Sequence, residues 1–186
     1  MDMNALREQV AACRNCPLCE GRTNTVFGTG NEKADIMFIG EAPGKNEDLT
    51  GEPFVGAAGR LLNDYLTACG LSRGDVYIAN ILKCRPPQNR DPLPAEEDCC
   101  IAYLERQIEL VDPKLIVCLG RIAAKRLIDP DFAVTKQHGE LHRRNGRLIM
   151  GTFHPAALLR NGANKAPTLA DFEKIAALRQ RNFETD

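Results

Sequence analysis

The 186-residue sequence has no apolar run long enough to span a membrane, and neither sign of charge is in large excess. Its N-terminus, MDMNALREQV, lacks the basic and then apolar pattern of a secretory signal peptide. The formal net charge of −1 gives no general attraction to nucleic acid or to an anionic membrane, so nucleic-acid binding would need a local basic patch. We therefore expect a cytoplasmic protein that has no membrane partner.

Two common nucleotide-binding patterns are also missing. The segment GEAPGKN begins at Gly40 and has three residues between its glycines, where a P-loop has four, and Asn46 replaces the P-loop hydroxyl. No G-x-G-x-x-G pattern opens a helix. We find no internal repeat or linker, and 44% hydrophobic residues is ordinary for a globular protein. The chain is expected to form one domain, 1–186.

Four short apolar segments are typical of buried strands, and helical patterns separate them. The expected strands are 35–40, 75–82, 114–119 and 148–153. The expected helices are 4–12, a helix from 55 that stops before Gly70, 94–110, 120–128 and 168–181. The polar segment 41–53 is expected to be a loop, and 132–147 a β excursion with a turn at 144–146. This alternation predicts an α/β fold with a mainly parallel central sheet.

Polar groups follow three of the expected strands. The segment from Glu41 to Phe54 follows the first, Asn80 lies near the end of the second, and His154 follows the fourth. The carboxyl ends of parallel strands share one edge of the sheet, so these groups are expected to meet in one crevice. Acidic side chains beside an aromatic ring suit a polar ligand with a flat face.

Eight cysteines are many for a chain of this size in a reducing compartment, where they indicate metal binding or catalysis rather than disulfides. Cys13 and Cys16 form a C-x-x-C pair that is common in metal hairpins. Cys69 and Cys118 lie in apolar surroundings and are expected to be buried core residues. A site made of four cysteine thiolates can bind either zinc or an iron–sulfur cluster, and the residues alone leave both possibilities open.

Several motifs resemble those of the family 4 uracil-DNA glycosylases. These motifs are GEAPGKNED at 40–48, PFVGAAGRLL at 53–62, NILKCRPPQNRDPLP at 80–94 and HPAALLRN at 154–161. The resemblance implies a three-layer α/β/α sandwich with a central parallel four-stranded sheet. It also implies an enzyme, expected to be a monomer, that hydrolyses the N-glycosidic bond of deoxyuridine in single- or double-stranded DNA.

The family carries a [4Fe–4S] cluster, and its pattern selects Cys13, Cys16, Cys84 and Cys100 as the ligands. Cys19 and Cys99 are extra cysteines that remain open as substitutes. Cys84 precedes Arg-Pro-Pro, as the family pattern requires. Cys100 is preferred to Cys99 because the family's aromatic residue, here Tyr103, follows its cysteine by three positions. The resemblance favours iron–sulfur over zinc and implies a structural cluster.

The resemblance also implies how uracil is bound. Phe54 stacks on the ring, Asn80 reads O4 and N3–H, and His154 donates a hydrogen bond to O2. The uracil-binding residues implied are Gly40, Glu41, Ala42, Phe54, Asn80 and His154. Superfamily members with the strongest activity carry an Asp at the position of Ala42. Glu41 and Glu47 therefore join His154 as candidate catalytic residues.

A base within a duplex must be flipped out before a glycosylase can reach it. Leu158 or Leu159 is expected to wedge into the vacated stack, while Arg85, Arg90 and Arg160 are candidates for phosphate contacts.

One alternative is a protein that captures uracil-DNA without turnover. A related family forms a covalent uracil complex through a His-bearing insertion, but 84–94 contains no histidine, and the motif reads GEAPG rather than GEQPG. An iron–sulfur redox protein has only the cysteines in its favour. We expect hydrolysis.

Overall fold

Four short apolar segments form the parallel centre of a six-stranded sheet in the computed structural model, which describes residues 1–185. The spatial order of the strands is β1-β3-β2-β4-β6-β5. The central strands are β2 (Ile36–Gly40), β3 (Tyr77–Asn80), β4 (Leu115–Leu119) and β6 (Arg147–Thr152). All of them are covered by helices on both faces, which explains why their sequences are apolar runs rather than alternating patterns.

Two antiparallel strands extend the sheet beyond the predicted four. β1 (Thr29–Gly30) pairs with β3, and β5 (His142–Arg144) pairs with β6. Asn145 and Gly146 have positive φ angles and form the tight turn of the β5–β6 hairpin. The prediction of a β excursion at 132–147 is correct for its second half only, because Val134–Gln137 forms the helix α7.

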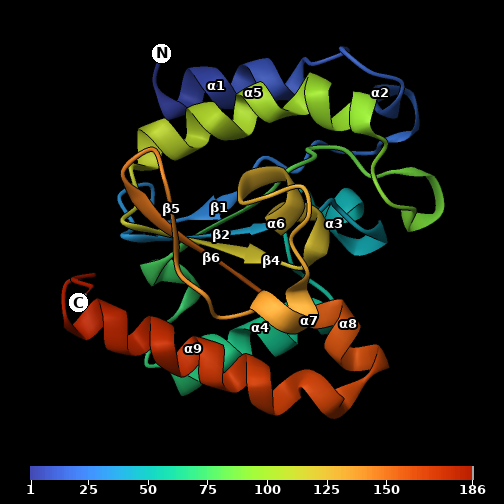
Figure 1. The fold of residues 1–186 in the computed structure, drawn as a ribbon. Helices are drawn as coiled ribbons and strands as arrows, with labels where there is room; N and C mark the ends of the chain where they lie inside the picture. Colours follow the sequence, from blue (N-terminus) through green and yellow to red (C-terminus); the bar gives the residue numbers. More distant parts are fainter. Residues whose placement is uncertain (186) are drawn as a thin grey trace.

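Helices cover both faces of the sheet, so the predicted three-layer sandwich is confirmed (Figure 1). Alternate strand residues point to opposite faces. Met37 and Ile39 pack in a core with α1 (Met3–Ala11), α5 (Pro94–Val111) and α6 (Arg121–Leu127). The other core joins the sheet to α4 (Ala57–Ala68), α8 (Pro155–Arg160) and α9 (Lys165–Gln180). Within residues 1–185, no helix is both long and apolar enough to cross a membrane.

The segment predicted to be a loop between β2 and α4 contains a short helix, α3 (Lys45–Thr50). Its buried Asp48 carboxylate accepts hydrogen bonds from the backbone N–H groups of Thr23 (2.9 Å) and Asn24 (3.3 Å), which hold the helix against the segment before β1. Gly51, with φ of 78°, ends the helix in the left-handed conformation. The remaining short helices are α2 (Leu18–Gly21) and the 3₁₀ turns η1 (Arg73–Asp75), η2 (Pro87–Asn89) and η3 (Gly162–Asn164).

Candidate functional site

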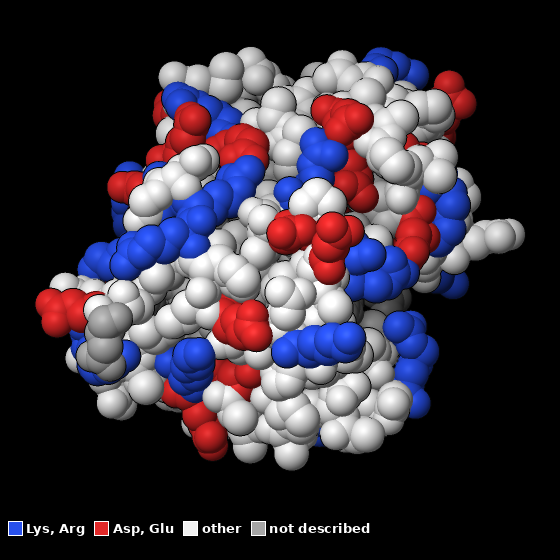
Figure 2. Space-filling model, in the orientation of Figure 1, with Lys and Arg blue, Asp and Glu red and all other residues white. Residues whose placement is uncertain are grey.

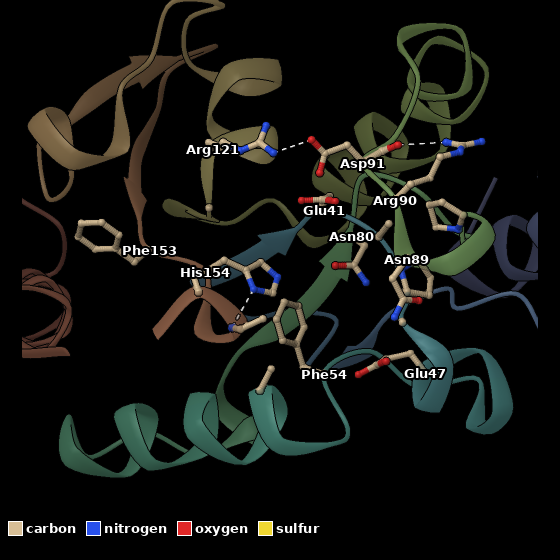
Figure 3. Close-up of a pocket in the computed structure, with 18 of the residues that line it drawn as sticks. Glu41, Glu47, Phe54, Asn80, Asn89, Arg90, Asp91, Arg121, Phe153 and His154 are labelled. Atoms are coloured by element: carbon tan, nitrogen blue, oxygen red, sulfur yellow. Dashed lines mark hydrogen bonds and ion pairs between the residues drawn. The ribbon is translucent and has the colours of Figure 1, made fainter. Parts of the chain in front are cut away.

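A cavity of about 400 Å³ opens at the carboxyl ends of the central strands. It brings together the polar groups that were predicted to meet at this edge. Figure 3 shows Phe54, Asn80 and His154 directed toward one space, with Glu41 beside it. Ala42 and Glu47 also line the cavity, and Gly40 lies directly behind it.

Phe54 occupies an unusual backbone conformation for a bulky residue, with φ of 51°. Such left-handed conformations cost energy and persist only where the surroundings enforce them. Arg73 donates to the carbonyl oxygens of Phe54 (3.1 Å) and Pro53 (2.6 Å). A Cβ at Gly59 would collide with the Phe54 backbone, so glycine is required there. These contacts hold the Phe54 ring in the cavity wall.

Glu47 also supports this wall. One of its carboxylate oxygens accepts a hydrogen bond from the backbone N–H of Val55 at 3.1 Å. Because Val55 follows Phe54, the contact ties α3 to the segment that carries the aromatic ring. Sequence reasoning identified Glu47 but found no reason for this contact or for the role of Arg73.

Asn80 is 2% exposed and stands at the end of β3. Its side-chain oxygen Oδ1 is buried and has no hydrogen-bond partner within residues 1–185. A Cβ at Gly40 would collide with this oxygen and with the Phe54 ring, so Gly40 allows both groups to approach the strand. A buried acceptor without a partner costs about 1–3 kcal/mol. The orphaned oxygen therefore indicates a ligand that supplies an N–H donor.

His154 caps the first turn of α8. Its Nδ1 accepts a hydrogen bond from the backbone N–H of Ala156 at 3.1 Å, which leaves Nε2 as the protonated nitrogen of the neutral ring. Burial lowers the pKa of His154 to about 4, and the positive charge of Arg160 acts in the same direction. His154 is therefore a neutral donor at pH 7. Its ring lies 5.5 Å from that of Phe54.

Glu41 lies close to an ion pair, between Asp91 and Arg121, that the sequence did not predict. Asp91, in the segment after β3, pairs with Arg121 at the start of α6 at 2.5 Å. Burial raises the pKa of Glu41, and the negative charge of Asp91 raises it further. No local pattern predicts this pair, because its two members are 30 residues apart and lie on different elements.

The candidate DNA contacts differ in their surroundings. Arg90 and Arg160 line the cavity, whereas Arg85 does not line it and donates to the side chain of Asn89, which does. Arg90 also makes a two-pronged ion pair with Glu96, at 2.6 and 2.9 Å. On the face drawn in Figure 2, acidic and basic side chains are interspersed. Any DNA contact on this face must therefore rest on a few local arginines.

The two leucines after His154 have opposite environments. Leu158 is 1% exposed and packs in the core with α4 and α9, so its prediction as a wedge is wrong. Leu159 is 49% exposed. The helical repeat of α8 explains the difference, since adjacent residues point about 100° apart and only one can face the core.

Six of the eight cysteines surround a second, smaller cavity. They are Cys13, Cys16, Cys19, Cys84, Cys99 and Cys100. The predicted ligands thus lie together although up to 87 residues separate them in the chain. Two N–H groups donate to sulfur at 3.3 Å, one from the Arg22 side chain to Cys84 and one from the Lys83 backbone to Cys100. Cys69 and Cys118 lie elsewhere: Cys118 is buried in the core, as predicted, whereas Cys69 is only partly buried and packs against the core.

The donor set fits an iron–sulfur cluster. Within residues 1–185, no group of three or more His, Cys, Asp or Glu side chains is arranged to hold a single metal ion. Cysteine thiolates are the ligands of iron–sulfur clusters, and the six cysteines around this cavity supply the four that a [4Fe–4S] cluster needs. The N–H donors directed at sulfur are of the kind that tunes such clusters.

Comparison with known proteins agrees with the fold and the pocket. The profile of the uracil-DNA glycosylase superfamily matches residues 27–177, which include all four central strands and the residues around the cavity. The chain therefore belongs to the uracil-DNA glycosylase superfamily.

Relatives narrow the assignment to one branch. A type-4 uracil-DNA glycosylase from Archaeoglobus fulgidus is 48% identical over 178 residues, which cover 91% of this chain and 89% of that protein. One from Thermotoga maritima is 45% identical and covers 92% of each chain. A type-5 uracil-DNA glycosylase from Pyrobaculum aerophilum is 32% identical, over 80% of this chain and 73% of its own. The chain is thus a member of the type-4 family.

Proposed function

We propose that this protein hydrolyses the N-glycosidic bond of deoxyuridine in DNA, releasing uracil and leaving an abasic site. The observation that carries this proposal is the buried, unpartnered Oδ1 of Asn80 at the edge of the cavity. The relatives named as type-4 uracil-DNA glycosylases support it. The reaction is the first step of base-excision repair.

Asn80 and Phe54 select the base. The Oδ1 atom of Asn80 accepts the N3–H of uracil, and its amide donates to O4. Cytosine offers the reversed pattern and would leave buried groups unpaired, which is a large penalty. Phe54 provides a flat apolar surface for stacking. Glu41 and Ala42 line the same cavity, and Gly40 lies directly behind Asn80 and Phe54.

His154 stabilises the leaving group. As the bond breaks, negative charge develops on O2 of uracil, and the Nε2–H of His154 donates a hydrogen bond to it. Because the ring is already neutral and its Nδ1 is held by the N–H of Ala156, it needs no rearrangement during the reaction. Such preorganised donors typically contribute about 10²–10³-fold to the rate.

We assign to Glu41 the role of the base that accepts a proton from the attacking water. Ala42 stands where the most active superfamily members carry an Asp, so Glu41 is the acidic side chain of this loop that remains free to accept a proton in the cavity. Its raised pKa makes it a stronger base than an exposed carboxylate. Glu47, whose carboxylate holds Val55, serves mainly to position Phe54.

The flipped-out uridine enters the cavity while neighbouring groups hold the DNA. The exposed Leu159 fills the vacated position in the stack. Arg160 and Arg90, at the rim, meet phosphates, and Arg85 extends this contact along the segment after β3.

We propose that Cys13, Cys16, Cys84 and Cys100 hold a [4Fe–4S] cluster. When bound, it supplies structural cross-linking rather than chemistry at the base. Its four ligands would join the N-terminal segment to α5 and to the loop after β3, and that loop carries Arg85 and Arg90. A cysteine-rich chain with a thiolate-bound cluster suits a reducing compartment, so we propose a cytoplasmic location. We expect a monomer.

The deciding experiment is the release of free uracil from single- and double-stranded oligonucleotides that contain one deoxyuridine. Free uracil together with an alkali-labile abasic site supports hydrolysis. A stable protein–DNA adduct with no free uracil would instead identify a capture protein. An oligonucleotide with thymine at the same position is the matched control.

A further inference from the structure

Lys83 is a buried lysine that lies between the uracil pocket and the cysteine site. It is 1% exposed and occupies the position between the end of β3 and Cys84. Its ammonium donates to the backbone carbonyl of Asn80 at 2.9 Å and to Oε1 of Gln107 at 2.5 Å. The side chain therefore folds back and holds the residue that reads uracil.

The backbone of the same residue contacts the cysteine site. The N–H of Lys83 donates to the sulfur of Cys100 at 3.3 Å, and Lys83 itself lines the cysteine cavity together with Leu82 and Cys84. One residue thus contacts both sites, through its side chain on one side and its backbone on the other.

Neutral groups surround the ammonium. Gln107 is fully buried, and its amide donates to Phe27 O (2.8 Å) and Tyr77 OH (3.3 Å), which directs its oxygen toward Lys83. Within residues 1–185, no carboxylate forms an ion pair with Lys83. A buried cation without a counter-charge is costly. Cysteines that bind a metal are thiolates, so an occupied cysteine site supplies the missing negative charge.

We propose that Lys83 is a positioning residue that couples the two sites. The negative charge of the occupied cysteine site holds its ammonium in place, and the ammonium holds the carbonyl of Asn80. This inference rests on the proposed function and its cluster. It predicts that the cluster influences uracil reading without contacting the base.

The first test compares thermal stability with and without iron. The variants are Lys83→Met, which removes the charge, and Lys83→Gln, which removes the charge but keeps an N–H donor. Lys174→Met is the matched control, because Lys174 also donates to a carbonyl, that of Gly139 at 2.6 Å, and neither residue lines either cavity. Iron is measured in every preparation. We expect iron depletion to lower the melting temperature of the wild type and of the control by the same amount, and that of both Lys83 variants by clearly less.

The second test uses iron-loaded protein. We expect Lys83→Met to slow single-turnover uracil release by about tenfold, the effect of one hydrogen bond to a charged group, with DNA affinity at fixed salt nearly unchanged. Lys83→Gln should retain more of the rate. Lys174→Met should match the wild type.

The outcomes separate the two levels of the proposal. Wild-type protein that binds no iron while releasing uracil overturns the cluster and the coupling, but not the glycosylase. If the wild type binds iron, but iron depletion lowers its melting temperature by the same amount as that of both Lys83 variants, the coupling alone is overturned. A wild-type rate in iron-loaded Lys83→Met overturns the positioning role. If Lys83→Met does not fold, Lys83→Gln decides the coupling through the stability measurement, because it also lacks the charge.

Discussion

The backbone N–H of Ala156 donates to Nδ1 of His154 at 3.1 Å, and this contact sets the opposite ring nitrogen, Nε2, as a hydrogen-bond donor. We predict that His154→Ala slows single-turnover uracil release by about 10²-fold, because the charge on O2 exists mainly in the transition state. DNA affinity at fixed salt should be nearly kept, since it rests on phosphate contacts and stacking. A collapse of affinity with the saturated rate intact would mean that His154 positions DNA instead.

A second prediction concerns the pH dependence of stability. The pKa of His154 is lowered to about 4 in the folded protein, against about 6.5 in the unfolded chain. The folded state therefore binds fewer protons, so its stability is full above about pH 6.5 and declines as the pH falls toward 4. Between pH 7 and 4.5, the wild type should lose roughly 2 kcal/mol more unfolding free energy than His154→Ala. Denaturant titrations at both values measure this, and equal losses would contradict the lowered pKa.

Asn80→Asp should impair uracil reading. The carboxylate keeps acceptors but loses the amide donor to O4, and it can accept a hydrogen bond from the exocyclic amine of cytosine. We expect slower uracil release and a small new release of cytosine, measured on otherwise identical oligonucleotides. Asn80→Ala is the matched control, which should lose uracil activity without gaining cytosine activity. Unchanged uracil kinetics in the Asp variant would place Asn80 outside the recognition step.

The two adjacent leucines of α8 provide a paired test. Leu159→Ala should reduce release from double-stranded DNA more than from single-stranded DNA, because only the duplex needs a wedge to replace the flipped base. Leu158→Ala should instead destabilise the protein by about 2–5 kcal/mol, as expected for a buried leucine. Equal losses on both substrates in Leu159→Ala would argue against the wedge.

The cysteine assignment can be tested by metal analysis. Purified protein should be yellow-brown, and Cys84→Ala or Cys100→Ala should lose iron. Cys69→Ala and Cys118→Ala should retain it, because both residues pack away from the cysteine cavity. Anaerobically prepared wild type with one zinc and no iron would rule out the cluster. Loss of iron from Cys69→Ala would overturn the choice of ligands.

Much of the fold follows from local sequence patterns. Apolar runs such as 36–40 and 115–119, separated by helical segments, require a parallel sheet covered on both faces. Once the strands are parallel, their carboxyl ends share one edge, so the meeting of Asn80 and His154 was predictable from position alone. The motifs shared with the glycosylase family also selected four of the six cysteines that gather at the second cavity, all but Cys19 and Cys99.

Only the tertiary structure decided the details that depend on long-range contacts. The left-handed backbone of Phe54 is held by long-range contacts, among them the hydrogen bond to its carbonyl from Arg73, 19 residues away. The opposite fates of Leu158 and Leu159 depend on which side of α8 meets the core. Lys83 gains its place between two sites only because β3 and α5 bring Asn80 and Gln107 around its ammonium. No local pattern encodes such contacts, because the partners are joined by packing and not by sequence spacing.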